Sequence, residues 1–158
     1  MKIRINLYPV WMVSFLVLGF SLQAQSSSDG LAAAAQKGDR AAFQKLLTLG
    51  ERGTLSAEFN LGFLYQHGEG VDKDPKKAAE WYQQAAERGH PSAQYNLGGM
   101  YLRGDGVEKD LVMAYFWRKL AADDEDEQSA GLAAIAKKMT SSELSKAKKA
   151  VKNWKPRR

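Results

Sequence analysis

The sequence predicts an all-α chain built from stacked pairs of antiparallel helices. Residues 57–89 repeat themselves 36 positions later, with fourteen identities in 33 positions and no insertion. Within each copy, apolar residues recur at helical spacing on both sides of a Gly-x-Gly-Val turn. A unit of this length cannot bury its apolar faces alone, so the repetition indicates a solenoid in which each unit packs on its neighbour.

The first helix of each unit is predicted from an apolar stripe and a glycine. Ala57, Leu61 and Tyr65 lie four residues apart and therefore share one helix face. A glycine in the middle of a helix costs about 1 kcal/mol relative to alanine, yet Gly62 returns in the second copy as Gly98. The repeated glycine predicts close approach of a neighbouring helix at this point.

The turn and the second helix are marked by residues with defined backbone roles. Gly68 suits the left-handed conformation that ends a helix, and Gly70 keeps the following turn tight. Asp74 occupies the N-cap position and Pro75 the first helical position, while Asp110 repeats the cap without the proline. The packing face of the second helix is expected at i, i+3 and i+7, namely Ala78, Trp81 and Ala85.

This pattern resembles the Sel1-like repeat, a relative of the tetratricopeptide repeat. The resemblance is carried by Ala-x-x-x-Leu-Gly-x-x-Tyr-x-x-Gly-x-Gly-Val-x-x-Asp, followed by Ala-x-x-Trp and Ala-Ala, over residues 57–125. It implies a right-handed α/α superhelix with a concave binding surface. It also implies an adaptor or scaffold role in envelope, signalling or host-contact complexes, with no common enzyme activity.

The N-terminus has the layout of a secretory signal peptide. Lys2 and Arg4 precede a mostly apolar run over residues 7–20, and Ala24 supplies a small residue before a polar segment. The alternative, a transmembrane anchor, needs about 20 apolar residues, and this run is shorter and is interrupted by Pro9. We therefore expect cleavage after Ala24 and a periplasmic or secreted location.

The chain accordingly divides into five segments. These are a signal peptide at 1–24, a degenerate helix pair at 25–56, repeats at 57–92 and 93–128, and C-terminal capping helices with a basic tail at 129–158.

Charge and composition narrow the choice of partners. Residues 25–136 carry twelve Lys or Arg and seventeen Asp or Glu, a net charge of −5, whereas residues 137–158 carry nine Lys or Arg and one Glu, a net charge of +8. The absence of cysteine excludes disulfides and thiolate metal sites. We expect no cofactor, no metal and no catalytic residue, and export argues against nucleic acid as a partner.

The binding surface is expected on the first helix of each pair, because those helices line the concave face of a tetratricopeptide-like stack. Exposed aromatic side chains beside polar ones suit a protein or peptide partner. The predicted contacts are the side chains off the apolar stripe: Phe59, Phe63, Gln66, Tyr95, Leu102 and Arg103. For Phe59 and Tyr95, packing between helices is an equal alternative.

The C-terminal segment is predicted to form an amphipathic helix opened by a capping box between Thr140 and Glu143. Its apolar stripe consists of Leu144, Ala147, Val151 and Trp154. One interpretation is a solenoid cap with its lysines in water. The other is a basic surface for anionic lipid headgroups, cell-wall polymers or acidic proteins. That surface consists of Lys146, Lys148, Lys149 and Lys152.

Three further patterns favour structural roles over catalysis. Ser145 and Lys148 have the Ser-x-x-Lys spacing of penicillin-interacting enzymes, but the companion motifs Ser-Asp-Asn and Lys-Thr-Gly are absent. A cell-wall hydrolase of that type is the enzymatic alternative. His67 and His90 fit helix ends. The acidic run at 123–127 fits a solvated junction better than a cation site.

Overall fold

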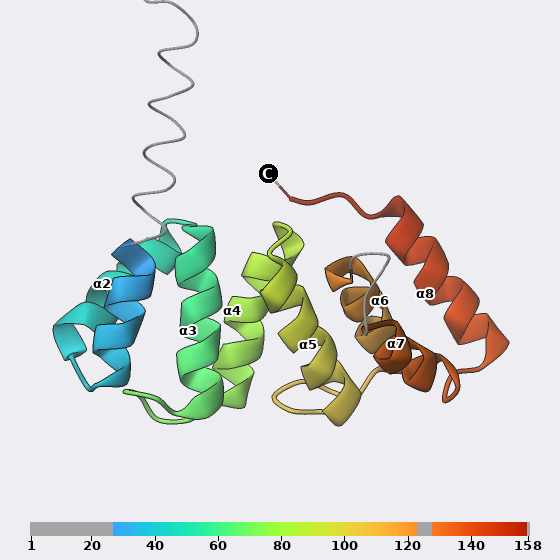
Figure 1. Ribbon diagram of the computed structural model, residues 1–158, viewed down its shortest axis with the longest axis horizontal. Helices are drawn as coiled ribbons and strands as arrows, with labels where there is room; N and C mark the ends of the chain where they lie inside the picture. Colours follow the sequence, from blue (N-terminus) through green and yellow to red (C-terminus); the bar gives the residue numbers. More distant parts are fainter. Residues whose placement is uncertain (1–26, 123–127, 158) are drawn as a thin grey trace, which may run out of the picture.

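The computed structural model describes residues 27–122 and 128–157, and all regular structure in these residues is helical. The helices stand side by side in one row from α2 to α8 (Figure 1). In chain order they are a helix at 27–36, α2 (Arg40–Glu51), α3 (Leu55–His67), α4 (Pro75–Glu87), α5 (Pro91–Arg103), α6 (Leu111–Ala121), α7 (Gln128–Ala136) and α8 (Ser141–Asn153). The predicted all-α solenoid is confirmed. The predicted signal peptide and the acidic run at 123–127 lie outside the described residues.

The helix ends follow the predicted capping residues. The side chain of Asp74 accepts a hydrogen bond from the backbone N–H of Lys77 at 3.0 Å. Asp110 accepts two, at 2.8 and 3.0 Å, from the first turn of α6. Gly68 and Gly104 end α3 and α5 in the left-handed conformation, with φ of 73° and 75°. Each of these boundaries is set by residues within one helical turn.

The mid-helix glycines mark close helix crossings, as predicted. A Cβ on Gly62 would lie 2.6 Å from Cδ1 of Tyr82 in α4. A Cβ on Gly98 would lie 2.8 Å from Cγ of Arg118 and 3.1 Å from the carbonyl oxygen of Ala114, both in α6. Any larger side chain at either position would push the two helices of a pair apart.

The second glycine of each turn has a role that the sequence did not reveal. Gly70 and Gly106 have φ of 73° and 72°. A Cβ on Gly70 would collide with the carbonyl oxygen of Ala35, and one on Gly106 with that of Pro75. These glycines therefore let each turn pack directly on the backbone of the preceding helix pair.

The core consists of three clusters along the row. The first joins the helix at 27–36 with α2 and α3 around Leu46, the second joins α4, α5 and α6 around Leu97, and the third joins α6, α7 and α8 around Ile135. Tyr82 has no exposed surface and belongs to the second cluster, whereas Trp81 is half-buried and packs on the first. The predicted packing residues Ala78 and Ala85 are fully buried as well, and Tyr82 is a core residue of α4 that the prediction did not include.

Helix α8 closes the stack. Its capping box is complete: the N–H of Glu143 donates to Oγ1 of Thr140 at 3.2 Å, and the N–H of Thr140 donates to Oε2 of Glu143 at 2.7 Å. Ala147 is fully buried, and half-buried Leu144 and Val151 pack on the core clusters. The apolar stripe of α8 therefore faces inward.

The segment after α8 returns along the stack towards its middle (Figure 1). The N–H of Arg157 donates to the carbonyl oxygen of Glu87 at 2.7 Å, and its Nη1 lies 3.1 Å from Oε2 of the same residue. Trp154 and Pro156 pack beside Gly89, at the junction of α4 and α5. The C-terminal tail therefore ties the end of the chain to the junction between the two repeats.

Candidate protein-binding surface

In the first repeat, the side chains between α3 and α4 form a closed aromatic cluster. The buried hydroxyl of Tyr82 donates to Oε1 of Gln66 at 2.8 Å. The Tyr82 ring lies 5.8 Å from that of Phe59, which stacks on the imidazole of His90 at 4.6 Å. Burial raises the pKa of Tyr82, so its hydroxyl stays protonated and remains a donor. Phe59 and Gln66 therefore have their main contacts within the fold.

The second repeat carries different side chains at the equivalent positions. Thirty-six residues after Tyr82, Phe59 and Gln66 come Arg118, Tyr95 and Leu102. The guanidinium carbon of Arg118 lies 3.6 Å from the centroid of the Tyr95 ring, a cation–π contact. Nε of Arg118 is buried and has no hydrogen-bond partner among the described residues. A hydrogen-bonded phenol in the first repeat is thus replaced by a cation beside a leucine in the second.

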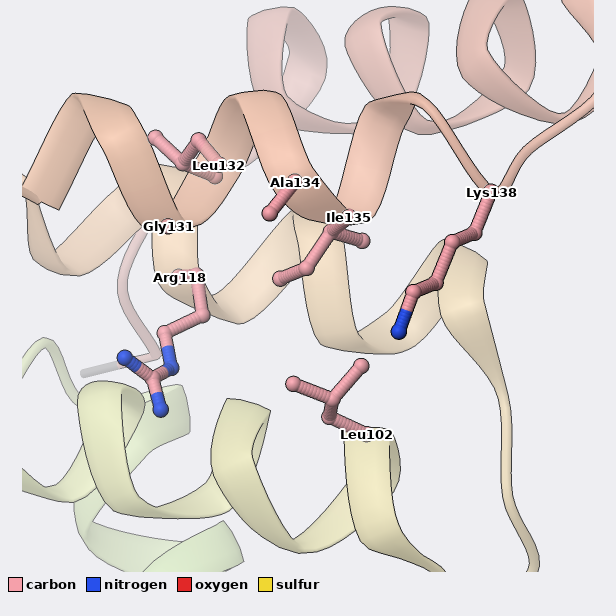
Figure 2. A pocket seen from close by; sticks show the side chains of 7 residues that line it. All are labelled: Leu102, Arg118, Gly131, Leu132, Ala134, Ile135 and Lys138. Atoms are coloured by element: carbon pink, nitrogen blue, oxygen red, sulfur yellow. The ribbon is translucent and has the colours of Figure 1, made fainter.

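A cavity of about 220 Å³ opens beside Arg118, between α5, α6 and α7. Arg118 and Lys138 lie on opposite sides of it, with the side chains of Leu102 and Ile135 between them (Figure 2). Ile135 and Leu132 are buried, whereas Lys138 is exposed. The cavity combines an apolar floor with a cation at either side.

Gly99 leaves space for a second guanidinium next to Arg118. The equivalent residue of the first repeat is Phe63, so a bulky ring is replaced by a buried glycine. A Cβ on Gly99 would lie 3.1 Å from Nη2 of Arg118 and 3.2 Å from Nη1 of Arg103. Arg103 also makes a long ion pair with Asp105, at 3.8 Å. Two guanidinium groups therefore converge over one turn of α5, which makes the potential there positive.

The repeated unit is shared with a known sequence family. The Sel1 repeat matches residues 55–90 and 91–126, which cover α3 to α6. The chain contains two Sel1 repeats. Sel1 repeat proteins are generally protein-interaction modules.

Two solved structures have the same fold. One is a protective antigen present in uropathogenic Escherichia coli strains, which displays an SLR fold. It is 30% identical with a TM-score of 0.70, over 81% of this chain and 29% of that protein. The other is a Sel1 repeat protein from Oxalobacter formigenes, 29% identical with a TM-score of 0.62, over 71% of this chain and 49% of that protein.

One curated relative has a similar repeat segment. The chitin synthase regulator SKT5 of Saccharomyces cerevisiae is 39% identical over 57 residues, which are 36% of this chain and 8% of that protein. The chain thus spans less than a tenth of this relative and less than half of either solved structure.

Of the six residues predicted to contact a partner, those of α5 gather around Arg118 in this Sel1 repeat protein. Tyr95 is 40% exposed, Leu102 lines the cavity, and Arg103 is exposed. On α3, Phe59 packs between helices, which is the second of the two alternatives for this residue. Phe63 is half-buried, and its ring lies 4.3 Å from that of His67. The predicted contact residues on α5 are therefore more exposed than those on α3.

The sequence prediction missed Arg118, Gly99 and Lys138. The first two could have been found in the repeat comparison, because Arg118 replaces an aromatic residue on the packing side of the unit and Gly99 replaces Phe63. No signal in the sequence pointed to Lys138, which reaches the cavity only because α7 packs beside α6.

The two histidines lie at helix ends, as predicted. Nδ1 of His90 accepts a hydrogen bond from the N–H of Ala93 at 3.3 Å and caps α5, and burial lowers the pKa of His90. His67 is the last residue of α3. Within residues 27–122 and 128–157, no three His, Asp or Glu side chains are grouped closely enough to hold a metal ion.

The basic face of α8 is a second surface of this Sel1 repeat protein. Its four predicted members, Lys146, Lys148, Lys149 and Lys152, are all exposed. Ser145 is exposed on the same helix, so the Ser-x-x-Lys pair lies at the surface and outside the cavity at Arg118.

Proposed function

We propose that this Sel1 repeat protein is a non-enzymatic adaptor or scaffold of the bacterial cell envelope that binds a protein or peptide on its concave face. The observation that carries the proposal is the group of exposed or half-buried side chains on α5 beside an open cavity: Tyr95, Leu102 and Arg103. An exposed aromatic ring flanked by Arg side chains is typical of protein-binding hot spots.

The envelope location rests on the N-terminal sequence and on one relative. The order of Lys2, Arg4, the apolar run and Ala24 is that of a cleaved signal peptide. None of the described helices is long and apolar enough to cross a membrane. A structural relative is a protective antigen of uropathogenic Escherichia coli, which supports a location accessible from outside the cytoplasm.

Site-specific photo-crosslinking tests the binding surface. A benzoyl-phenylalanine in place of Tyr95 should form a covalent adduct with a partner protein in cells. The same group in place of Gln44, which is exposed on α2 at the far end of the row, should form none. Equal adducts from both positions, or none from the Tyr95 position, would contradict the proposed surface.

A pair of variants separates binding from folding. Phe63→Ala combined with Arg103→Ala should weaken capture of the crosslinked partner and leave the melting temperature nearly unchanged, because neither side chain is buried. Loss of capture together with loss of folded protein would show that these residues act in the fold instead.

The basic face of α8 supports a second candidate, an envelope-associated structural role. Replacing its four lysines with Gln should leave the fold intact, because the apolar stripe of α8 is untouched. If this surface is the functional element, the variant loses envelope association and high salt has the same effect, since exposed charges are screened over about 10 Å at 0.1 M salt. The hydrolase alternative has less support, because Ser145 and Lys148 are exposed on one face of α8 and lie outside the cavity at Arg118.

A further inference from the structure

The second repeat and the segment after α7 carry cations that lack matching anions among the described residues. No ion pair joins Arg118 or Lys138 to a carboxylate among the described residues, and the one ion pair of Arg103 is long, at 3.8 Å. Nε of Arg118 is buried without a hydrogen-bond acceptor. A guanidinium is suited to a carboxylate because its N–H groups match both oxygens. These features favour an anionic ligand.

The size of the cavity indicates what accompanies the anion. Pockets for small molecules and cofactors occupy about 300–1,000 Å³, whereas this cavity has about 220 Å³. Its floor is apolar, formed by Leu102, Leu132 and Ile135. A space of this size and lining suits a single apolar side chain of a larger ligand.

The first repeat shows that these features belong to the second repeat alone. At the equivalent positions, Tyr82 is buried and hydrogen-bonded to Gln66, and Phe63 occupies the place of Gly99. The first repeat therefore has neither the guanidinium nor the glycine beside it. The two repeats therefore differ in the side chains at these equivalent positions.

We infer that the second repeat, together with α7 and Lys138, binds an acidic peptide segment of a partner protein, with carboxylates on Arg118, Arg103 and Lys138 and an adjacent apolar side chain in the cavity. The inference rests on the proposed function and names the chemistry of the partner. The aromatic ring of Tyr95 holds the Arg118 guanidinium in place for this contact.

Fluorescence anisotropy on the full chain tests the inference. The probe is a short labelled peptide in which one leucine is flanked by aspartate and glutamate. It should bind at least about tenfold more tightly than a peptide in which asparagine and glutamine replace the acids, because the loss of a hydrogen bond between charged groups weakens binding by about that factor. It should also bind more tightly than a peptide with serine in place of the leucine. Equal binding of all three peptides would overturn the inference.

Variants of the chain locate the site. Arg118→Gln should weaken binding of the acidic peptide at least about tenfold. Ala134→Leu should weaken it similarly with all charges kept, because Ala134 is exposed at the edge of the cavity and a leucine there fills it. Lys45→Gln, which removes one exposed charge on α2, is the matched control and should leave the affinity unchanged. If Arg118→Gln fails to fold, Ala134→Leu still tests the inference.

Two outcomes contradict the inference and leave the proposed function standing. In the first, substitution of the four α8 lysines abolishes peptide binding while Arg118→Gln and Ala134→Leu do not. In the second, the partner found by crosslinking binds Arg118→Gln and Ala134→Leu as tightly as the unmodified chain. Failure of the crosslinking itself would instead contradict the proposed function.

Discussion

Replacing Gly62 with Ala should destabilise this protein, although the same substitution usually stabilises a helix. The new Cβ would lie 2.6 Å from Cδ1 and 2.7 Å from Cε1 of Tyr82. The ring cannot move away easily, because Tyr82 is fully buried and its hydroxyl is hydrogen-bonded to Gln66. Overpacking of this kind costs about 1–3 kcal/mol, and the better helix propensity of alanine offsets about 1 kcal/mol of it. We therefore expect a net loss of up to about 2 kcal/mol.

Urea denaturation followed by circular dichroism measures this loss. Gly30→Ala is the matched control, because it makes the same change in the helix at 27–36 where no atom lies within 4 Å of the new Cβ. This control should gain about 0.5–1 kcal/mol of stability. If Gly62→Ala is as stable as the unmodified chain while Gly30→Ala is more stable, the crossing of α3 and α4 does not require a glycine at position 62.

Three further predictions follow from burial and charge. His90→Asn keeps the N-cap of α5. Because burial lowers the pKa of His90 in the folded chain, the unfolded chain binds this proton first, and the unmodified chain should lose stability in thermal melts as the pH falls through about 6.5 and below, whereas the variant should not. Burial raises the pKa of Glu58 despite the guanidinium of Arg88 at 2.9 Å, so the folded chain binds a proton at this carboxylate before the unfolded chain does. As the pH falls from neutrality to about 4.5, the unfolding free energy of the unmodified chain should therefore rise relative to that of Glu58→Gln. Trp154→Ala should cost about 1–2 kcal/mol in urea denaturation, because the half-buried indole packs on the second core cluster, whereas Lys155→Ala should change the stability by less than about 0.5 kcal/mol.

The helix boundaries and crossings could be predicted because they depend on neighbouring residues or on exact repetition. Asp74, Asp110 and Gly68 each act within one helical turn. Gly62 indicates a helix crossing, because a glycine that lowers helix stability is repeated at the same position of the next unit. The inward stripe of α8 follows from helical spacing in the same way.

The remaining features depend on contacts that spacing does not encode. Tyr82 is fully buried against Gly62 and Phe59 of α3, whereas half-buried Trp81 packs on the first core cluster, and helical spacing alone does not reveal this difference. The tail contact joins Arg157 to Glu87 across 70 residues of sequence. The cavity between Arg118 and Lys138 exists only because α7 packs beside α6, after the repeat pattern has faded.

Methyl NMR of the chain with its crosslinked partner tests the binding surface most directly. Addition of the partner should shift the methyl signals of Leu102, Leu132 and Ile135, which line the cavity, and leave those of Leu46, buried in the first core cluster, unchanged. Shifts confined to Val151 and other methyl groups of α8 would contradict the account and assign the partner to the basic helix.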